Sequence, residues 1–584
     1  MKKNCAWVLA LLFIVALLPI ASTMIVFHPD ERHYSEAAIH MISSGDFLTP
    51  KEIDGTLRLI KPPITYWAIA GNYALWGISP FSLRLSFILA AGLIVFYIYK
   101  IGQDLCYKND VGEIAALILI SSPQFIMAAF RANPDILLTL FILISANGFL
   151  HLIIKPGPQK HHYWEAYLGA GIAAMTKGLL PILFVIYSLL FAYLTFKKTK
   201  TPFKKIIHAP SMFTGLFIAV IWYLLIMRIY GLNSITDFYN DQIGHKITPS
   251  YLKLLIGPAL FILAYLLNLL PWSAIALTIS IKQKAFIKNK DHLSSLYDIQ
   301  KFILIWTAIS AFIFGINKDG INMRYMTPFL PLIALWLAAV ISRAKESIRR
   351  HVIKTTIFII TFIIFLLTIT TALIYTLIND QIWATLLLFI ITSVYLIIIL
   401  IEKRNKWITA CKALAIGILL AFPLFDFALS PIIIPEISLK IVTQLNKIDP
   451  TNKYQIVCIS VSTIPSKIKI ASRGKRMPLW YNIDHKPIVD YSKRIRANNP
   501  NAILIVSEKF LPGVKNCRSN YKWHTVINKG HYKWKDIIKA VKNNNLQEYI
   551  ETYGKKFFIG IPLQNHPVAK DHVTQRVKSI FDLL

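Results

Sequence analysis

Long apolar blocks separated by short polar segments repeat along this chain of 584 residues. Blocks such as 7–27 and 355–378 hold about 20 apolar residues, the length of an α-helix that crosses a bilayer. The blocks recur as far as about residue 430, which predicts an all-α polytopic membrane domain over 1–434. We place about thirteen spans near residues 6–27, 81–100, 111–130, 135–154, 164–177, 179–196, 208–230, 254–281, 301–316, 325–342, 354–378, 383–401 and 407–430.

The first long polar segment, 28–80, interrupts this alternation and predicts a folded loop. A helix-like stretch covers 31–43, and an apolar stretch covers 64–76, which is too short to cross a bilayer. The second stretch is rich in aromatic side chains, as helices at a membrane–water interface are: Tyr66, Trp67, Tyr73 and Trp76. We therefore expect two helices lying on the membrane surface.

From about residue 435 the apolar runs shorten to the length of strands. Such runs cover 455–461, 502–507 and 557–561, and a helix-like stretch covers 534–545. The pattern predicts a small soluble α/β domain over 435–584. It contains Cys458 and Cys517, which would form a disulfide in an exported domain or remain two buried thiols; both alternatives are open.

The basic residues give the predicted spans an orientation. The formal net charge is +33, the mean hydropathy is +0.52, and Lys2 and Lys3 precede the first span. With the N-terminus in the cytoplasm, every predicted inside loop is basic, whereas the outside loop 379–381 has no basic residue. The loop 28–80 and the C-terminal domain then lie outside. The positive charge is therefore explained by anionic lipid headgroups, without a nucleic-acid partner. The sequence also has no zinc-finger spacing and no Walker-type phosphate loop.

Carboxylates occur where predicted spans end on the outside. Asp30 and Glu31 follow the first span directly, and Asp135 follows the turn before the fourth. An acid in the first turn of a helix is also a common structural choice, because the helix dipole favours it. The same acids are nevertheless well placed for general base catalysis at the membrane surface.

Cations occur in the same outside segments. Arg58 and Lys61 lie in the first loop, where Pro62 and Pro63 stiffen the backbone after Lys61. Lys177 is alone in an apolar stretch, and Arg324-Tyr325 begins a later span. A solvated loop, a snorkelling lysine and an interfacial aromatic pair are the structural alternatives. Together, acids and cations converging on one face suit a substrate that carries a phosphate.

One histidine, His245, follows the seventh span in a polar loop. A lone histidine in such a loop is more often not a metal ligand. A divalent metal is therefore an open alternative at this position, and no cofactor is assigned.

Several of these segments together resemble a known superfamily. They are Asp30-Glu31, Ser44-Gly45-Asp46, Lys61-Pro62-Pro63-Ile64-Thr65-Tyr66-Trp67, Arg84-Leu85, Met175-Thr176-Lys177-Gly178 and Arg324-Tyr325-Met326-Thr327-Pro328. Over about 24–335 the chain resembles the protein mannosyltransferases and lipid A aminoarabinose transferases. These are glycosyltransferases of the GT-C fold that use polyprenyl-phosphate sugars. The C-terminal domain resembles that of the lipid A transferases in position and size only.

The resemblance implies roles for the matched residues. Asp30 resembles the essential acid of the family's first loop, and Asp135 its second outside acid. Lys61 resembles the lysine that holds the donor phosphate, and Arg324 with Tyr325 the donor-binding pair. Two departures are clear: Ile60 occupies a position that is usually acidic, and Gln242 one that is usually histidine, with His245 three residues later.

The resemblance implies an inverting glycosyltransferase of the bacterial inner membrane with a periplasmic active site. Its donor would be an undecaprenyl-phosphate sugar, and its acceptor lipid A or another envelope glycolipid. Two alternatives are a protein O-mannosyltransferase and a transporter or flippase for lipid-linked sugars. Transporters usually carry repeats and polar groups at mid-membrane, whereas here the charges lie at the ends of spans and no repeat is visible. The sugar, the acceptor and the oligomeric state do not follow from the sequence.

Overall fold

The protein is described from a computed structural model. It describes residues 2–22, 29–52, 55–106, 110–155, 157–178, 180–199, 203–239, 251–283, 294–317, 322–356, 359, 407–433, 437–459, 468–473, 475, 479–480, 502–507, 521–529 and 554–562.

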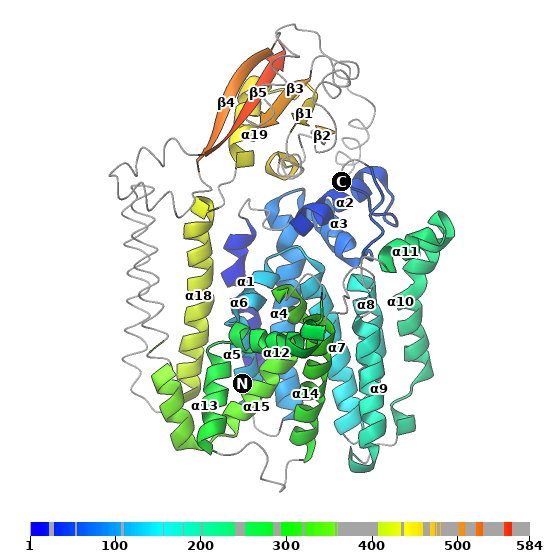
Figure 1. Cartoon of the computed structure of the whole chain (residues 1–584), viewed down its shortest axis with the longest axis vertical. Coiled ribbons are helices and arrows are strands. Elements are labelled where there is room, and N and C mark those ends of the chain that lie inside the picture. The colour runs from blue at the N-terminus through cyan, green and yellow to red at the C-terminus, as the bar shows by residue number, and fades with distance from the viewer. Residues whose placement is uncertain are drawn as a thin grey trace.

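A bundle of helices forms the larger part of the chain (Figure 1). Its elements are α1 (Lys2–Ala21), α4 (Pro80–Leu105), α5 (Val111–Ile120), α6 (Pro123–Ala129), α7 (Pro134–Ile154), α8 (Lys160–Lys177), α9 (Leu180–Thr199), η1 (Phe203–Lys205), α10 (Ala209–Tyr230), α11 (Asn233–Tyr239), α12 (Tyr251–Asn268), α13 (Trp272–Gln283), α14 (Ser294–Gly315), η3 (Met323–Phe329), α15 (Leu330–Ser342) and α18 (Trp407–Ile433).

Membrane-spanning length is met by several of these helices. Within the described ranges, five helices are long and apolar enough to cross a membrane, and seven if each of two bent pairs counts as one span. The helices α1, α9 and α18 contain shorter apolar stretches. The spans predicted at 354–378 and 383–401 lie almost entirely outside the described residues, so the number thirteen stays a prediction.

Two predicted spans are not single straight helices. The span expected over 111–130 is divided into α5 and α6, which are bent by 69°, and the span expected over 254–281 into α12 and α13, where the bend is 105°. A proline occurs at each break, since Pro123 is the first residue of α6 and Pro271 lies between α12 and α13. Proline cannot supply the N–H that would continue a helix. The sequence predicted one span in each case because the residues on both sides of each break are apolar.

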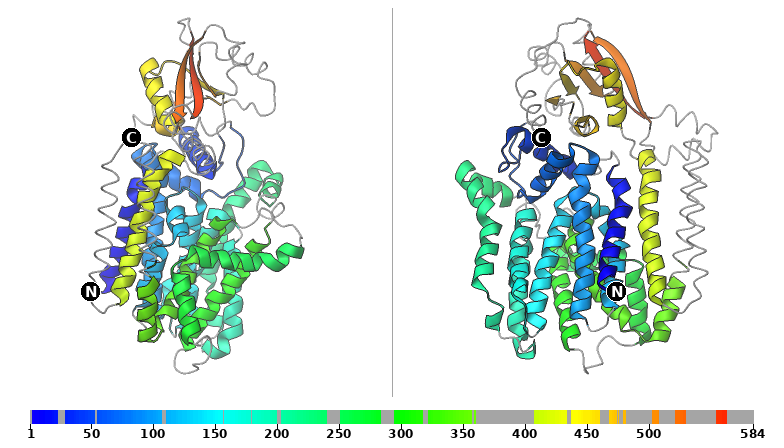
Figure 2. Two further views of the ribbon diagram at one scale, coloured as in Figure 1. Left: turned by 60° about the vertical axis from the view of Figure 1, so that its left-hand side comes forward. Right: turned by 180° about the vertical axis from the view of Figure 1, so that it is seen from behind.

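Two helices lie across one end of the bundle, α2 (Pro29–Ser44) and α3 (Ile64–Trp76) (Figures 1 and 2). Their bounds coincide within two residues with the helix-like stretches of the sequence. The loop between them is attached to its surroundings, because the indole of Trp222 on α10 donates to the carbonyl of Leu48 at 3.0 Å and Trp67 donates to that of Phe47 at 2.7 Å. This end of the bundle is therefore covered by a fixed layer.

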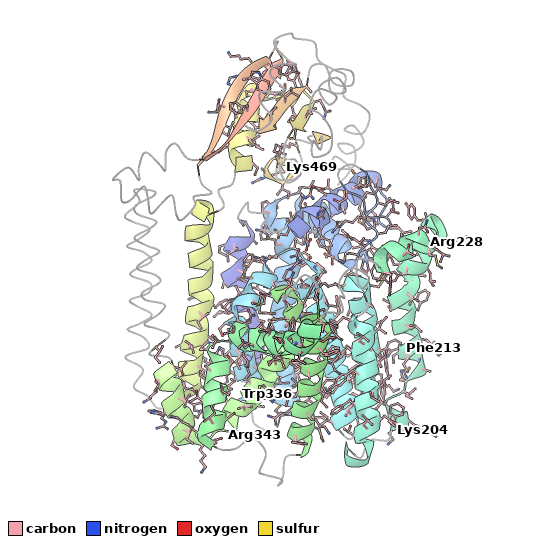
Figure 3. The ribbon with its side chains drawn as sticks, viewed as in Figure 1. Lys204, Phe213, Arg228, Trp336, Arg343 and Lys469 are labelled. Carbon is pink, nitrogen blue, oxygen red and sulfur yellow. The ribbon has the colours of Figure 1, made fainter. Side chains whose placement is uncertain are left out.

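The centre of the bundle is α7. In its most apolar window 89% of the residues are buried, compared with 22% for α10, which exposes residues such as Phe213 on the outside of the bundle (Figure 3). Close packing around α8 depends on glycine. A Cβ on Gly148 of α7 would lie 2.3 Å from the Ala166 nitrogen, and one on Gly171 of α8 would lie 2.3 Å from the Gly215 carbonyl oxygen of α10. These helices approach as closely as small residues permit.

The C-terminal part contains a five-stranded sheet with the order β2-β1-β3-β5-β4. The strands are β1 (Ile456–Ile459), β2 (Leu479–Trp480), β3 (Ile503–Ser507), β4 (Tyr521–Lys529) and β5 (Gly554–Pro562). The pairs β1–β2 and β1–β3 are parallel, with Cys458 opposite Ile505, and the pairs β3–β5 and β4–β5 are antiparallel. The helix α19 (Ile437–Ile448) contributes Ile441 and Leu445 to the apolar core of this sheet.

The sequence-predicted strands at 455–461, 502–507 and 557–561 fall on β1, β3 and β5. Cys458 is a buried free thiol in β1, whereas Cys517 and the helix expected at 534–545 lie outside the described residues.

The sheet lies beyond the end of the bundle that α2 and α3 cover (Figures 1 and 2). A short helical turn at 468–471 makes the contact. Ile468 belongs to the core of the sheet, whereas Ile470, two residues later, belongs to the core of the bundle. Lys469 marks this boundary in Figure 3, and Lys204 and Arg343 lie at the opposite end of the bundle.

Candidate active site

A buried ion pair fixes the first turn of α2. Glu31 is 0% exposed, and both of its carboxylate oxygens accept from the Arg84 guanidinium of α4, at 3.0 and 3.1 Å. The backbone N–H of Ala132 donates to the same carboxylate at 2.9 Å. A two-pronged guanidinium–carboxylate pair has a strongly preferred geometry. Glu31 therefore joins α2, α4 and the turn between α6 and α7, and its carboxylate points into protein.

The neighbouring acid points the other way. The Asp30 carboxylate is 33% exposed, and its Oδ2 accepts from Arg324 at 2.5 Å. Arg324 lies in η3, where the Asn322 side chain accepts from its backbone N–H and caps the short helix. The two residues are 294 positions apart in sequence. A solvent-accessible carboxylate and a cation therefore meet between the first loop and the start of the span that includes α15.

A second acid–cation pair lies beside the first. Asp135, in the first turn of α7, accepts a short hydrogen bond from the ammonium of Lys177, which is the last residue of α8. Gly178 ends α8 with φ 103°, a conformation that favours glycine. The Lys177 ammonium also lies 4.9 Å from the centre of the Tyr325 ring, within cation–π range. Since Tyr325 follows Arg324, one continuous cluster links Asp30, Arg324, Tyr325, Lys177 and Asp135.

Further charges of the first loop lie close to this cluster. Glu52 accepts from Arg58 and from His33, each at 2.7 Å, and the Arg58 guanidinium lies 5.9 Å from the centre of the Tyr34 ring. Burial alone would raise the pKa of Glu52, but the His33 hydrogen bond and the Arg58 charge lower it overall. Burial raises the pKa of the nearby Tyr66 phenol to about 12, so this group stays neutral.

The structure brings together most of the residues that the sequence selected. Asp30, Asp135, Lys177, Arg324 and Tyr325 form the cluster, and Glu31 lies directly behind it. Lys61 is half-buried in the turn that leads into α3. His245, the candidate metal ligand, lies outside the described residues. Among the described residues, three or more His, Cys, Asp or Glu side chains come close enough to hold a metal ion only in the first turns of α8, away from this end of the bundle.

Two participants were not selected by sequence reasoning as site residues. Arg84 is 1% exposed inside a predicted span, and a charged residue at that depth was a usable signal. Glu52 carried no such signal, since acids are ordinary in polar loops.

The fold and this cluster define a class: a polytopic membrane protein with paired acids and cations at one end of its helix bundle, beneath a folded loop. Residues 60–224 match the family model described as dolichyl-phosphate-mannose-protein mannosyltransferase. A crystal structure of ArnT from Cupriavidus metallidurans bound to undecaprenyl phosphate superposes with a TM-score of 0.68 at 16% identity, over 94% of this chain and 97% of that one. This likeness shows the GT-C fold.

Two curated relatives extend the comparison. A protein of Aquifex aeolicus is 26% identical over 318 residues, 53% of this chain and 58% of the relative. The undecaprenyl phosphate-α-4-amino-4-deoxy-L-arabinose arabinosyl transferase of Aeromonas salmonicida is 24% identical over 361 residues, 60% of this chain and 62% of that protein. The chain thus spans about three fifths of these relatives. Its fold is that of the GT-C membrane glycosyltransferases, and over this part its sequence is similar to the aminoarabinose transferases.

Proposed function

We propose that this protein transfers a sugar from an undecaprenyl-phosphate donor to an envelope acceptor at the periplasmic face of the bacterial inner membrane. The observation that carries the proposal is the cluster of two carboxylates and two cations joined through Tyr325. Cations are needed where a phosphate leaves, and a carboxylate is needed where a hydroxyl becomes a nucleophile. The relatives that are named as undecaprenyl-phosphate aminoarabinose transferases support the same reaction class.

The chemistry is an inverting displacement at the anomeric carbon. The acceptor oxygen forms a bond to this carbon as the bond to the phosphate oxygen breaks, and the electron pair leaves with polyprenyl phosphate. Asp30 receives the hydroxyl proton, because it is the more exposed of the two site acids, at 33% compared with 4% for Asp135. Developing positive charge on the sugar is stabilised by the nearby carboxylates.

The cations neutralise the leaving phosphate. Arg324 and Lys177 approach from η3 and α8, and Lys61 and Arg58 come from the first loop. Tyr325 holds the Lys177 ammonium over its ring, while its own ring packs on Phe314 at 5.3 Å. Such fixed charges need little reorganisation during the reaction, which is how electrostatic preorganisation lowers a barrier.

Glu31 has a supporting role in this proposal. Its carboxylate is buried and fully engaged with Arg84 and the Ala132 N–H. It therefore orients Asp30 and the turn that leads to Asp135 and does not exchange protons with substrate.

Lipid A is the proposed acceptor, with a protein hydroxyl as the competing candidate because residues 60–224 match a protein mannosyltransferase model. Lys204 and Arg343 lie at the end opposite the cluster, in segments rich in basic residues (Figure 3). By the positive-inside rule this charge supports a cytoplasmic location for that end, and we propose that the site and the C-terminal sheet face the periplasm.

The deciding experiment is sugar transfer by the purified chain in detergent. Undecaprenyl-phosphate sugars would be supplied with either lipid A or a Ser/Thr peptide. We expect Asp30→Asn to lower the turnover rate by about 10²–10⁴-fold, the usual contribution of a general base, and Lys61→Ala to raise the donor KM. Two substitutions away from the cluster serve as matched controls and should retain activity: Glu346→Gln, an exposed acid at the opposite end, and Lys51→Ala, another first-loop lysine.

Transfer to lipid A alone would support the proposed acceptor, and transfer to the peptide alone would assign the protein acceptor. Full activity of Asp30→Asn would remove Asp30 as the base. Movement of lipid-linked sugar across liposomes without any transfer would assign a transporter instead.

A further inference from the structure

A second cluster of chemically capable side chains lies far from the candidate active site, where α7 ends and α8 begins. His161, His162 and Glu165 in the first turns of α8 each offer one ligand atom, and these atoms lie within 4.8 Å of one another. Lys177, at the other end of α8, is 15 residues from His162, or roughly 22 Å along a helix. The transfer reaction therefore makes no use of this cluster.

The cluster is held by α7. The Asn147 amide donates to Oε2 of Glu165 at 2.7 Å, and the Asn147 backbone carbonyl accepts from Nδ1 of His151 at 2.8 Å. The His151 ring stacks on that of His162, with centroids 4.2 Å apart and 10° between the planes. Gly148 lets the two helices approach this closely. Asn147 thus orients the Glu165 carboxylate and also the His151 ring, which stacks on His162.

The nitrogen atoms are suitably arranged for a metal. The Gln159 backbone N–H lies 3.1 Å from Nδ1 of His162, so binding of a metal at Nε2 would break this hydrogen bond and place the ring proton on Nδ1, as in a ligating histidine whose other nitrogen carries the proton. The His161 ring lies next to it, with centroids 4.0 Å apart. His162 is buried, Glu165 is half-buried and His161 is exposed, so the site has a protein-lined base and an opening to solvent.

We propose that His161, His162 and Glu165 bind a Zn²⁺ ion. Two imidazoles and a carboxylate form a His₂Glu set, which suits Zn²⁺ with a fourth position left for water. Ligand atoms about 2.0–2.1 Å from zinc lie roughly 3.3 Å apart, so side-chain rotations of the exposed His161 and of Glu165 would complete the site from the present separations. Because all three ligands lie on α8, the ion would stabilise the first turns of this helix, at the end opposite Lys177.

Metal binding by the full chain is the test. Protein purified with a histidine-free tag would be stripped with a chelator, and Zn²⁺ affinity would be measured by competition with a chromophoric chelator. The visible absorption of Co²⁺ in the same site would report its coordination. We expect one Zn²⁺ per chain and a rise in the melting temperature.

Three substitutions and a control separate this site from adventitious binding. His161→Ala and Glu165→Gln should weaken Zn²⁺ binding by more than about 100-fold, and Asn147→Leu, which removes a hydrogen bond behind a ligand, by about 10–100-fold. Glu165→Gln keeps an oxygen for Asn147 and should fold normally. The exposed His351 gives the control His351→Ala, which should bind like the wild type.

Equal Zn²⁺ affinity in the wild type and in Glu165→Gln, or wild-type protein that is folded and binds less than one ion tightly, would overturn the proposal. Sugar transfer would be measured in parallel as a separate readout. The Zn²⁺ affinities do not depend on the donor or acceptor proposed above, so the zinc site and the transfer reaction can fail independently.

Discussion

At the scale of single residues, adjacent acids in the first turn of α2 have opposite surroundings. Glu31 is enclosed by Arg84 and a backbone N–H, and Asp30 is accessible beside Arg324. Neighbouring side chains on a helix point about 100° apart, so one faces the bundle and the other faces the opening. Substitutions at the two positions should therefore fail in different ways.

Glu31→Gln is expected to lower stability, because it leaves the Arg84 charge buried without a counter-charge. Removing one partner of a buried pair costs about 3–5 kcal/mol. The melting temperature in detergent should fall clearly, with activity lost alongside it. Asp30→Asn should leave the melting temperature nearly unchanged, and the double substitution Glu31→Leu with Arg84→Met should recover part of the loss. A stable but inactive Glu31→Gln protein would instead make Glu31 catalytic.

Glu52 gives the first loop a dependence on acid pH. Its pKa is lowered in the folded state, so its contribution to stability is present above its ordinary value of 4.5 and is lost as the pH falls through the lowered value. Glu52→Gln should cost about 1–3 kcal/mol at pH 7, since two hydrogen bonds to a charged group weaken. Melting curves between pH 7 and 3.5 should show a steeper decline below pH 4.5 for the wild type than for the variant; parallel curves would contradict this.

At the scale of elements, α8 is held between α7 and α10 by backbone contact. Gly171 faces Gly215, and a Cβ on Gly215 would lie 2.4 Å from the Tyr167 carbonyl oxygen. Because α8 carries Lys177 at one end and the histidine cluster at the other, its exact position decides the geometry of both.

Gly171→Ala should therefore destabilise the bundle by about 1–3 kcal/mol, the usual cost of overpacking, even though alanine favours helices. Its matched control is Gly71→Ala in α3, where an added Cβ meets nothing within 4 Å. That change should stabilise by about 0.5–1 kcal/mol. If both substitutions raise the melting temperature, helix propensity and not steric contact determines the stability of the two variants.

The sequence predicted some of these elements well and others not at all. The helices α2 and α3 followed from local patterning, and α4, α7 and α10 from unbroken apolar length. The breaks after α5 and α12 were missed, because apolar runs on both sides hide a bend. Asp30, Asp135 and Lys177 were selected one by one from their positions at helix ends. Local sequence patterns could not predict how these residues pair, because Asp30 binds Arg324, which is 294 positions away.

At the scale of the whole molecule, a short helical turn at 468–471 connects the C-terminal sheet to the bundle. Ile468 and Ile470 are two residues apart and pack into different cores. Lys469 lies between them, close enough to Glu36 of α2 for their charges to interact, although burial is the larger influence and lowers the pKa of Lys469. The sheet therefore rests on the helix that carries Asp30.

Ile470→Ser is expected to loosen this attachment without unfolding the sheet, because it removes apolar contact with the bundle at a cost of about 2–4 kcal/mol. Limited proteolysis of the intact chain should release a C-terminal fragment faster than from wild type. The exposed Lys475 in the same segment provides the control Lys475→Ser. If the released fragment is itself digested faster than the wild-type fragment, as expected for Ile468→Ser, then Ile470 stabilises the sheet and not its attachment to the bundle.

The pairing of Asp30 with Arg324 also has a consequence for the order of events in catalysis. In the resting cluster each carboxylate already has its own cation, so in the proposed reaction an incoming phosphate would enter by counter-ion exchange. A phosphate that takes Arg324 would separate the Asp30 carboxylate from this guanidinium, which would let the carboxylate accept the hydroxyl proton. In the proposed reaction the base would therefore act only once the donor has arrived, and water near an empty site would meet a carboxylate that is already paired with a cation.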